Sequence, residues 1–142
     1  MNRLVANISI LLLMLTLTFI VTATDSPRPK ITVSTDFINI GKVKPTDIRK
    51  IPLTVQNNGQ ADLIINFITV DCPCTTFQFF TQDGTQTNLP LTIQPGNKIT
   101  DKVTFDASKT KYRGQFTKVI LIDSNDPAEP IKRVKMIGEI GE

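Results

Sequence analysis

Apolar and polar residues alternate along three separate segments of the chain, 51–56, 99–105 and 133–140. A period of two is typical of a β-strand that buries one face and leaves the other in water. The apolar positions that carry this pattern are Ile51, Leu53, Val55, Ile99, Val103, Phe105, Val134, Met136 and Ile140. No segment after residue 23 repeats apolar residues at spacings of three and four over a dozen positions, so no substantial helix is predicted.

Two further runs, 63–70 and 116–122, are apolar at both odd and even positions, which is typical of central strands covered on both faces. Turn-forming residues separate the predicted strands, and the first group is expected to close a turn with positive φ. These groups are Asn57-Asn58-Gly59, Asp83-Gly84, Gln94-Pro95-Gly96 and Ser124-Asn125-Asp126-Pro127. Short strands between regular turn signals predict an all-β fold, a single immunoglobulin-like antiparallel β-sandwich of about seven strands.

An antibody-type domain is disfavoured, because such a domain joins two distant strands by a cysteine pair packed on a buried Trp. Here Cys72 and Cys74 are only two residues apart, and the sequence contains no Trp. The core is therefore expected to consist of Ile, Leu, Val and Phe side chains.

The N-terminal residues have the order of a secretory signal peptide. Arg3 precedes an apolar run over 8–21, and Val21-Thr22-Ala23 places small residues before a polar segment. Residues 1–23 are predicted to be the signal peptide and 24–142 the Ig-like domain, exported to the periplasm or the extracellular space. The alternative is an uncleaved anchor, although a run of about 14 apolar residues is short for a membrane span. Membrane contact is expected only in that case.

Charge and composition exclude several classes of function. Arg3 is the only charged residue of 1–23, so its removal lowers the formal net charge from +3 to +2. This surplus is too small to indicate a nucleic-acid partner, and the scattered basic residues are interpreted as solvated surface. The chain has no His, so the commonest general base and metal ligand are missing. No catalytic residue, cofactor or resident metal is predicted, and the protein is not expected to be an enzyme.

Several motifs follow one another in a characteristic order: 38–43, 53–59, 63–65, 71–75, 93–96, 103–106, 114–118, 124–127 and 137–138. Together they resemble a bacterial family, the domain of unknown function numbered 1573, related to Hydin-type and major-sperm-protein-type domains. The family usually has Gly where this chain has Pro73, and the stretch 77–91 is longer here. The resemblance implies an Ig-like fold and export. It also favours a docking or scaffolding role by analogy with eukaryotic relatives.

Cys72-Pro73-Cys74 is the one reactive motif in the sequence. In an extended chain, the Cα atoms of residues i and i+2 are about 6.6 Å apart, which is near the upper limit for a disulfide. A bridge between Cys72 and Cys74 therefore requires a local bend. An oxidised staple or a pair of packed thiols is the first interpretation, since export favours oxidation. A disulfide-exchange site and a soft-metal site for Cu(I) or Zn(II) are the alternatives.

Other candidate sites are weaker. Phe77, Phe79 and Phe80 form either a partner-contact loop or an inward-packing strand. The acids Asp71, Asp123 and Asp126 are interpreted as strand-end and turn residues rather than a catalytic carboxylate pair or a calcium loop. The leading hypothesis is a non-catalytic exported module that docks another protein of the cell envelope through sheet edges or loops. The alternative is a thiol-disulfide or copper/zinc protein acting through Cys72 and Cys74.

Overall fold

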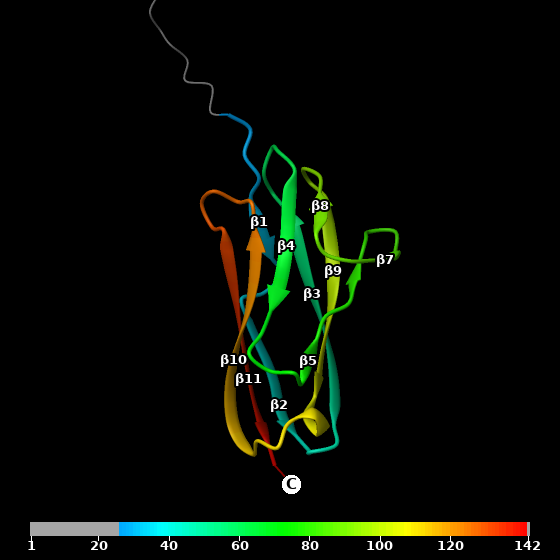
Figure 1. The fold of residues 1–142 in the computed structure, drawn as a ribbon, viewed down its shortest axis with the longest axis vertical. Helices are drawn as coiled ribbons and strands as arrows, with labels where there is room; N and C mark the ends of the chain where they lie inside the picture. Colours follow the sequence, from blue (N-terminus) through cyan, green and yellow to red (C-terminus); the bar gives the residue numbers. More distant parts are fainter. Residues whose placement is uncertain (1–25, 142) are drawn as a thin grey trace, which may run out of the picture.

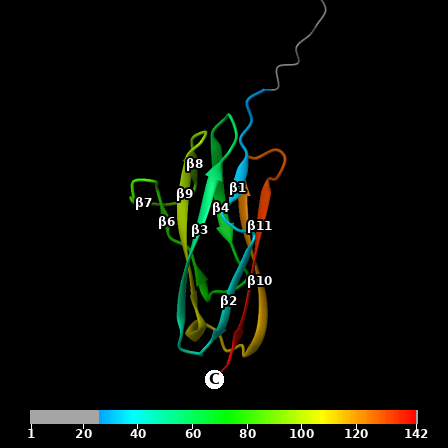
Figure 2. The same ribbon diagram turned by 180° about the vertical axis from the view of Figure 1, so that it is seen from behind.

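The computed structural model describes residues 26–141, which fold into two β-sheets packed face to face (Figures 1 and 2). The first sheet has the order β1-β3-β9-β6-β7, with β5 also paired to β9, and the second has the order β2-β11-β10-β4-β8. The first sheet contains β1 (Ile31–Val33), β3 (Ile48–Asn57), β5 (Thr75–Thr76), β6 (Phe79–Phe80), β7 (Gln86–Thr87) and β9 (Lys98–Asp106). The second contains β2 (Phe37–Val43), β4 (Leu63–Thr69), β8 (Leu91–Ile93), β10 (Gly114–Ser124) and β11 (Ile131–Ile140). The predicted β-sandwich is confirmed, and the described residues hold one short 3₁₀ helix, η1 (Ala107–Lys109).

The N-terminal part of the domain contributes a strand to each sheet. β1 pairs with β3 in the first sheet, and after residues 34–36 the chain crosses over so that β2 pairs with β11 in the second. The β2–β11 pair is parallel, whereas the sequence predicted an antiparallel sandwich throughout. Residues 26–141 form eleven strands rather than the expected seven or so, because 75–93 adds the short strands β5, β6, β7 and β8. Strand direction and short local pairings depend on contacts between distant segments, and residue alternation does not report them.

The alternating residues form the core between the two sheets, as predicted. Leu53 and Val55 of β3, Val103 of β9 and Val134 of β11 are all fully buried. Phe105 of β9 stacks on Phe116 of β10 with ring centroids 5.1 Å apart, so this aromatic pair joins the two sheets.

The prediction that 63–70 and 116–122 are covered on both faces is wrong. Ile64 and Phe67 in β4 and Val119 in β10 are exposed, while their neighbours Leu63 and Ile120 are fully buried. The other sheet covers only the inner face of these strands. The apolar outer positions therefore lie on the surface of the described part of the chain.

The turn after β3 forms as expected but not with the expected backbone. No non-glycine residue among 26–141 has positive φ, and neither does Gly59. Arg28 packs directly against this turn, and a Cβ on Gly59 would overlap the carbonyl oxygen of Arg28. Glycine is thus required here for close approach of the N-terminal segment. In contrast, Gly96 does adopt positive φ (78°), in agreement with the Pro95-Gly96 turn signal.

Gly138 of β11 makes room for the aromatic pair, and its replacement by alanine is expected to destabilise the fold. It lies opposite Phe116, and a Cβ would stand 2.6 Å from Cγ1 of Ile40 and 2.8 Å from Cζ of Phe116. Because Phe116 is stacked on Phe105, Gly138→Ala should lower the free energy of unfolding by about 1–3 kcal/mol. Urea denaturation measures this loss.

Gly141→Ala is the matched control. The nearest atom to its added Cβ is Cε of Lys42 at 3.3 Å, in a flexible side chain that can move. A change within about 0.5 kcal/mol is expected. Equal losses for the two variants would contradict the packing explanation.

Candidate functional site

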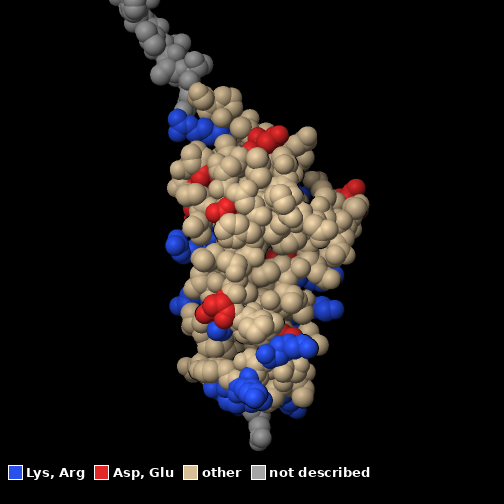
Figure 3. Space-filling view, in the orientation of Figure 1, with Lys and Arg blue, Asp and Glu red and all other residues tan. Residues whose placement is uncertain are grey.

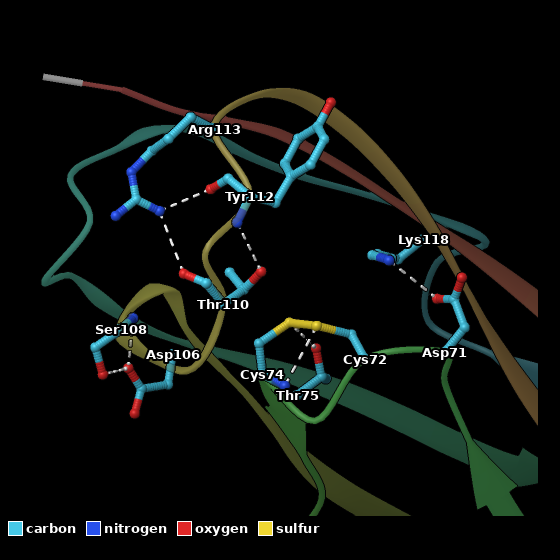
Figure 4. Close-up of a disulfide and its surroundings, with 10 residues drawn as sticks. All are labelled: Asp71, Cys72, Cys74, Thr75, Asp106, Ser108, Thr110, Tyr112, Arg113 and Lys118. Atoms are coloured by element: carbon cyan, nitrogen blue, oxygen red, sulfur yellow. Dashed lines mark hydrogen bonds and ion pairs between the residues drawn. A yellow bond between two sulfur atoms is a disulfide. The ribbon is translucent and has the colours of Figure 1, made fainter.

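Cys72 and Cys74 are joined by a disulfide in the turn between β4 and β5 (Figure 4). The turn brings their Cα atoms to 5.1 Å, which is the local bend that the sequence required. The backbone N–H of Cys74 donates a hydrogen bond to Sγ of Cys72 at 3.3 Å, and the N–H of Thr75 donates to the carbonyl of Cys72 at 3.2 Å. With both sulfurs in the bridge, neither is a thiolate that binds a soft metal ion.

The two sulfurs differ in accessibility. Cys74 is only 2% exposed and belongs to the core, while Cys72 is half-buried at its margin. The carbonyl of Cys74 accepts a hydrogen bond from the N–H of Asp106 (2.8 Å), which ties the turn to the end of β9. The bridge is therefore more accessible on the side of Cys72 than on the side of Cys74.

The bridge lines a pocket of about 260 Å³ between the ends of the two sheets. Apolar side chains and polar side chains both contribute to the wall. Besides the two cysteines these are Phe105, Phe116 and Ile140 together with Thr110, Tyr112, Gln115, Thr117 and Lys118. The pocket thus combines a hydrophobic surface, a disulfide bond and one cation.

The segment 110–115 is fixed above the bridge by its own hydrogen bonds (Figure 4). The hydroxyl of Tyr112 donates to the carbonyl of Gln115, and the guanidinium of Arg113 donates to the carbonyls of Thr110 (3.2 Å) and Tyr112 (2.8 Å). These bonds hold the loop that forms this wall of the pocket.

Lys118 was not singled out from the sequence. In β10 the inward positions are Phe116, Lys118, Ile120 and Ile122, so this lysine interrupts an apolar row and points between the sheets. Its Nζ lies 3.4 Å from Oδ1 of Asp71, the residue before Cys72, and its side chain is 25% exposed. The sequence signal that could have identified Lys118 was a single charged residue at an inward position of an otherwise apolar strand.

Basic residues gather at the same end of the molecule (Figure 3). The turn between β2 and β3 contacts η1 through a hydrogen bond from the N–H of Ala107 to the carbonyl of Asp47 (2.9 Å). The stretches around this turn and around η1 are separate in sequence, and both carry exposed cations. These are Lys42, Lys44, Arg49 and Lys50 around the turn, and Lys109, Lys111 and Arg113 in and after η1. Tertiary folding therefore converts residues that looked scattered into a basic end, with Asp47, Asp106 and Glu139 as its acids.

The predicted acids do not converge on one site. Asp71 pairs with Lys118, and Asp123 accepts a hydrogen bond from Asn66 at 2.6 Å. Asp126 is buried and accepts the N–H groups of Ile31 (2.8 Å) and, through its other oxygen, Ala128 (2.8 Å). Burial alone would raise the pKa of Asp126, but these backbone hydrogen bonds outweigh it and lower the pKa.

A second residue that the sequence prediction missed is Asp101 of β9. It lies between the buried residues Ile99 and Val103 on the inner face, and it is 0% exposed. One carboxylate oxygen accepts the N–H of Gln78 at 3.0 Å, and the other has no hydrogen-bond partner. Burial raises the pKa of Asp101 to about 7, although the hydrogen bond from Gln78 acts in the opposite direction.

The three phenylalanines of the proposed contact loop occupy different environments. Phe79 is buried in β6, and Phe77 is half-buried and packs against the core. Phe80 is half-buried too, with Nζ of Lys102 4.9 Å from its ring centroid.

Within 26–141 no group of three or more His, Cys, Asp or Glu side chains is placed to hold a metal ion.

The model of the family described as protein of unknown function (DUF1573) matches residues 31–140. The chain belongs to the DUF1573 family. The match includes both sheets and the Cys72–Cys74 bridge, and it confirms the resemblance detected in the sequence. No curated protein sequence matches this DUF1573 chain.

Solved structures with the same fold come from bacteria and human. A protein of unknown function from Porphyromonas gingivalis W83 has a TM-score of 0.64 and 19% identity over 78% of this chain, which spans only 46% of that protein. The ASH/PapD-like domain 7 of human CEP192 has a TM-score of 0.56 and 15% identity, with 85% of this chain and 92% of that domain covered. The E. coli chaperone DraB has a TM-score of 0.52 and 7% identity, with 79% and 56% covered. These similarities establish a PapD-like, Ig-like fold.

Residues 1–23, the predicted signal peptide, lie outside the described part of the chain. Within that part, no helix has the length and apolar character needed to cross a membrane.

Proposed function

We propose that this DUF1573 protein is a non-catalytic, exported module that docks a partner protein of the cell envelope on the outer face of its second sheet. The observation that carries this proposal is a set of exposed apolar side chains on adjacent strands of that face: Ile64 and Phe67 of β4, Val119 of β10 and Ile131 of β11. Exposed apolar groups that are neighbours across a sheet favour an interaction surface.

Strand register places these side chains on the same outer face, with charged residues between them. Asp123 of β10 is opposite Phe67 on one side and opposite Ile131 on the other. Val119, four residues along the same face, is opposite Lys135. The surface therefore consists of apolar side chains interspersed with Asp123 and Lys135, and it suits a partner patch of apolar residues that also carries charges of both signs.

The face is a better docking surface than the sheet edges that the sequence suggested. Among the described edge strands, β1 and β8 have three residues each and β7 has two. The longer edge strand β2 is interrupted where Ile40 and Gly41 bulge opposite Gly138, with Gly41 at a φ of 71°. Short or bulged edges bind an added strand poorly.

Two further features support export and the absence of catalysis. The Cys72–Cys74 bridge is of a kind that persists in oxidising compartments, which agrees with the leader predicted at 1–23. The acids of the described residues are dispersed into separate structural contacts, and the whole sequence has no His. Residues 26–141 therefore lack the usual groupings of acid–base residues and of metal ligands.

The test is a comparison of Phe67→Glu and Ile48→Glu in the full chain. Phe67 is 52% exposed on the proposed face, and Ile48 is 54% exposed at the start of β3 in the other sheet. Affinity-tagged chains are cross-linked in intact cells, and the partner captured by the wild type is quantified for each variant. Because a central aromatic contact contributes about 2 kcal/mol to binding, Phe67→Glu should weaken capture by about tenfold or more while Ile48→Glu leaves it unchanged.

Circular dichroism and urea unfolding confirm that both variants fold. The proposal fails if the wild type captures no protein above background, or if the two variants lose the partner equally.

A further inference from the structure

The Cys72–Cys74 disulfide contributes little to the stability of the fold. It closes a loop with a single residue, Pro73, between the two cysteines, and a bridge this short restricts the unfolded chain far less than one that closes a long loop. The turn is also held by the backbone hydrogen bonds from Thr75 to Cys72 and from Asp106 to Cys74. The position of the bridge on the wall of a pocket therefore calls for another explanation.

We propose that Cys72–Cys74 is a thiol–disulfide exchange site that oxidises a pair of cysteine thiols on an acidic segment of a partner protein. Cys72 is the sulfur that the partner attacks, because it is half-buried at the pocket while Cys74 is 2% exposed. This activity is separate from docking on the outer face of the second sheet.

The exchange takes place in two balanced steps. A thiolate of the partner forms a bond to Sγ of Cys72, the Cys72–Cys74 bond breaks, and Cys74 leaves as a thiolate that takes up a proton. The second partner thiol, as its thiolate, then attacks the partner sulfur of the mixed disulfide, and Cys72 leaves as a thiolate. The Cys72 thiolate then takes up a proton, so that two electrons pass from the partner dithiol, which becomes a disulfide, to the Cys72/Cys74 pair, and the two protons that the partner thiols release to solvent are matched by the two that the cysteines take up.

Groups around the bridge stabilise negative charge on sulfur. The N–H of Cys74 already donates to Sγ of Cys72 at 3.3 Å, so it is in place when Cys72 leaves as a thiolate in the second step. Lys118 lines the same pocket and is the one cation among its lining residues. Its ion pair with Asp71 (3.4 Å) keeps the ammonium beside the turn that carries the cysteines.

The pocket and its surroundings define the chemistry of the partner. Phe105, Phe116 and Ile140 offer an apolar surface for a side chain next to the reacting cysteine. The loop 110–115, which forms one wall of the pocket, carries Lys111 and Arg113 of the basic end defined above, so carboxylates that flank the cysteine pair favour encounter. An extended segment with two cysteines, an adjacent leucine or similar side chain, and acidic flanks fits these features.

The test uses the mature-length chain, residues 24–142, and a synthetic peptide with two cysteines, a leucine beside the first, and flanking glutamates. In Cys74→Ser, Cys72 is the only thiol, and the oxidised peptide should form a mixed disulfide with it that mass spectrometry detects. In Cys72→Ser the remaining Cys74 is buried, and trapping should be at least tenfold slower. Equal trapping by the two variants, or trapping by neither, would overturn the proposal.

A second variant tests the electrostatic part without altering either sulfur. Lys118→Met retains the length of the side chain and should slow reduction of the native bridge by the reduced acidic peptide about three- to tenfold. Lys98→Met, at the start of β9 and outside the pocket, should have no effect. A peptide with lysine flanks should react more slowly than the acidic one at low salt. Identical rates for Lys118→Met, Lys98→Met and the wild type would show that the pocket plays no part in exchange.

Discussion

Replacement of Asn57 by alanine is expected to lower the free energy of unfolding by about 3–4 kcal/mol. Asn57 ends β3 and is 0% exposed. Its Nδ2 donates to the carbonyls of Ala61 (2.7 Å) and Ile93 (2.8 Å), and its Oδ1 accepts the N–H groups of Gly59 (2.9 Å) and Lys30 (3.3 Å). A truncated side chain leaves these backbone groups without their partner, and each lost hydrogen bond costs about 1 kcal/mol.

Asn58→Ala provides the control for this prediction. Asn58 is the next residue, is exposed, and makes one side-chain hydrogen bond, from Nδ2 to Oγ1 of Thr32 at 3.0 Å. Its removal should change stability by less than about 1 kcal/mol. Urea denaturation of the two variants and the wild type measures the difference. Comparable losses at both positions would show that the buried network does not hold the turn together.

Asp101→Asn is expected to change the dependence of stability on pH. Burial raises the pKa of Asp101 to about 7 in the folded protein, from the 3.8 of an aspartate in water. Between these values the folded state holds a proton that the unfolded state has lost, so the stabilising contribution of the protonated group decreases as pH rises from about 4 to about 7. With 1.36 kcal/mol per pKa unit, the decrease is on the order of 4 kcal/mol.

The asparagine variant lacks this titration. Its stability relative to the wild type should therefore increase from about pH 4 to about pH 7 and level off above that, which chemical denaturation at several pH values measures. Asp106→Asn is the opposite-sign control, because the hydroxyl of Ser108 donates to that carboxylate and lowers the pKa of Asp106. Its deficit relative to the wild type should shrink as pH falls below about 4. A pH-independent difference for Asp101→Asn would contradict burial of an ionisable carboxyl.

Part of the candidate site was predictable from local sequence. The spacing of Cys72 and Cys74 identified the reactive pair and the bend that a bridge requires, because both follow from the reach of three residues. The surroundings were not predictable. Lys118 comes from β10 and Tyr112 from the preceding loop, and only folding brings them to the turn between β4 and β5.

Local alternation and turn residues were enough to predict the long strands, most turns and the inner face of the core. Side chains alternate across any extended backbone, so Leu53, Val55, Val103 and Val134 had to share the buried side once their segments were strands. The positive φ of Gly96 follows in the same local way from the Pro95-Gly96 pair.

The pairing of these strands, and the choice of which apolar residues remain outside, depend on contacts between segments far apart in the chain. The parallel contact of β2 with β11 joins segments about a hundred residues apart, and no local pattern encodes its direction. Phe67 and Val119 are as apolar as core residues, yet they are exposed because a two-layer sandwich covers one face of each sheet. Asp101 is polar and yet buried, because it alternates with Ile99 and Val103 on the inner face of β9.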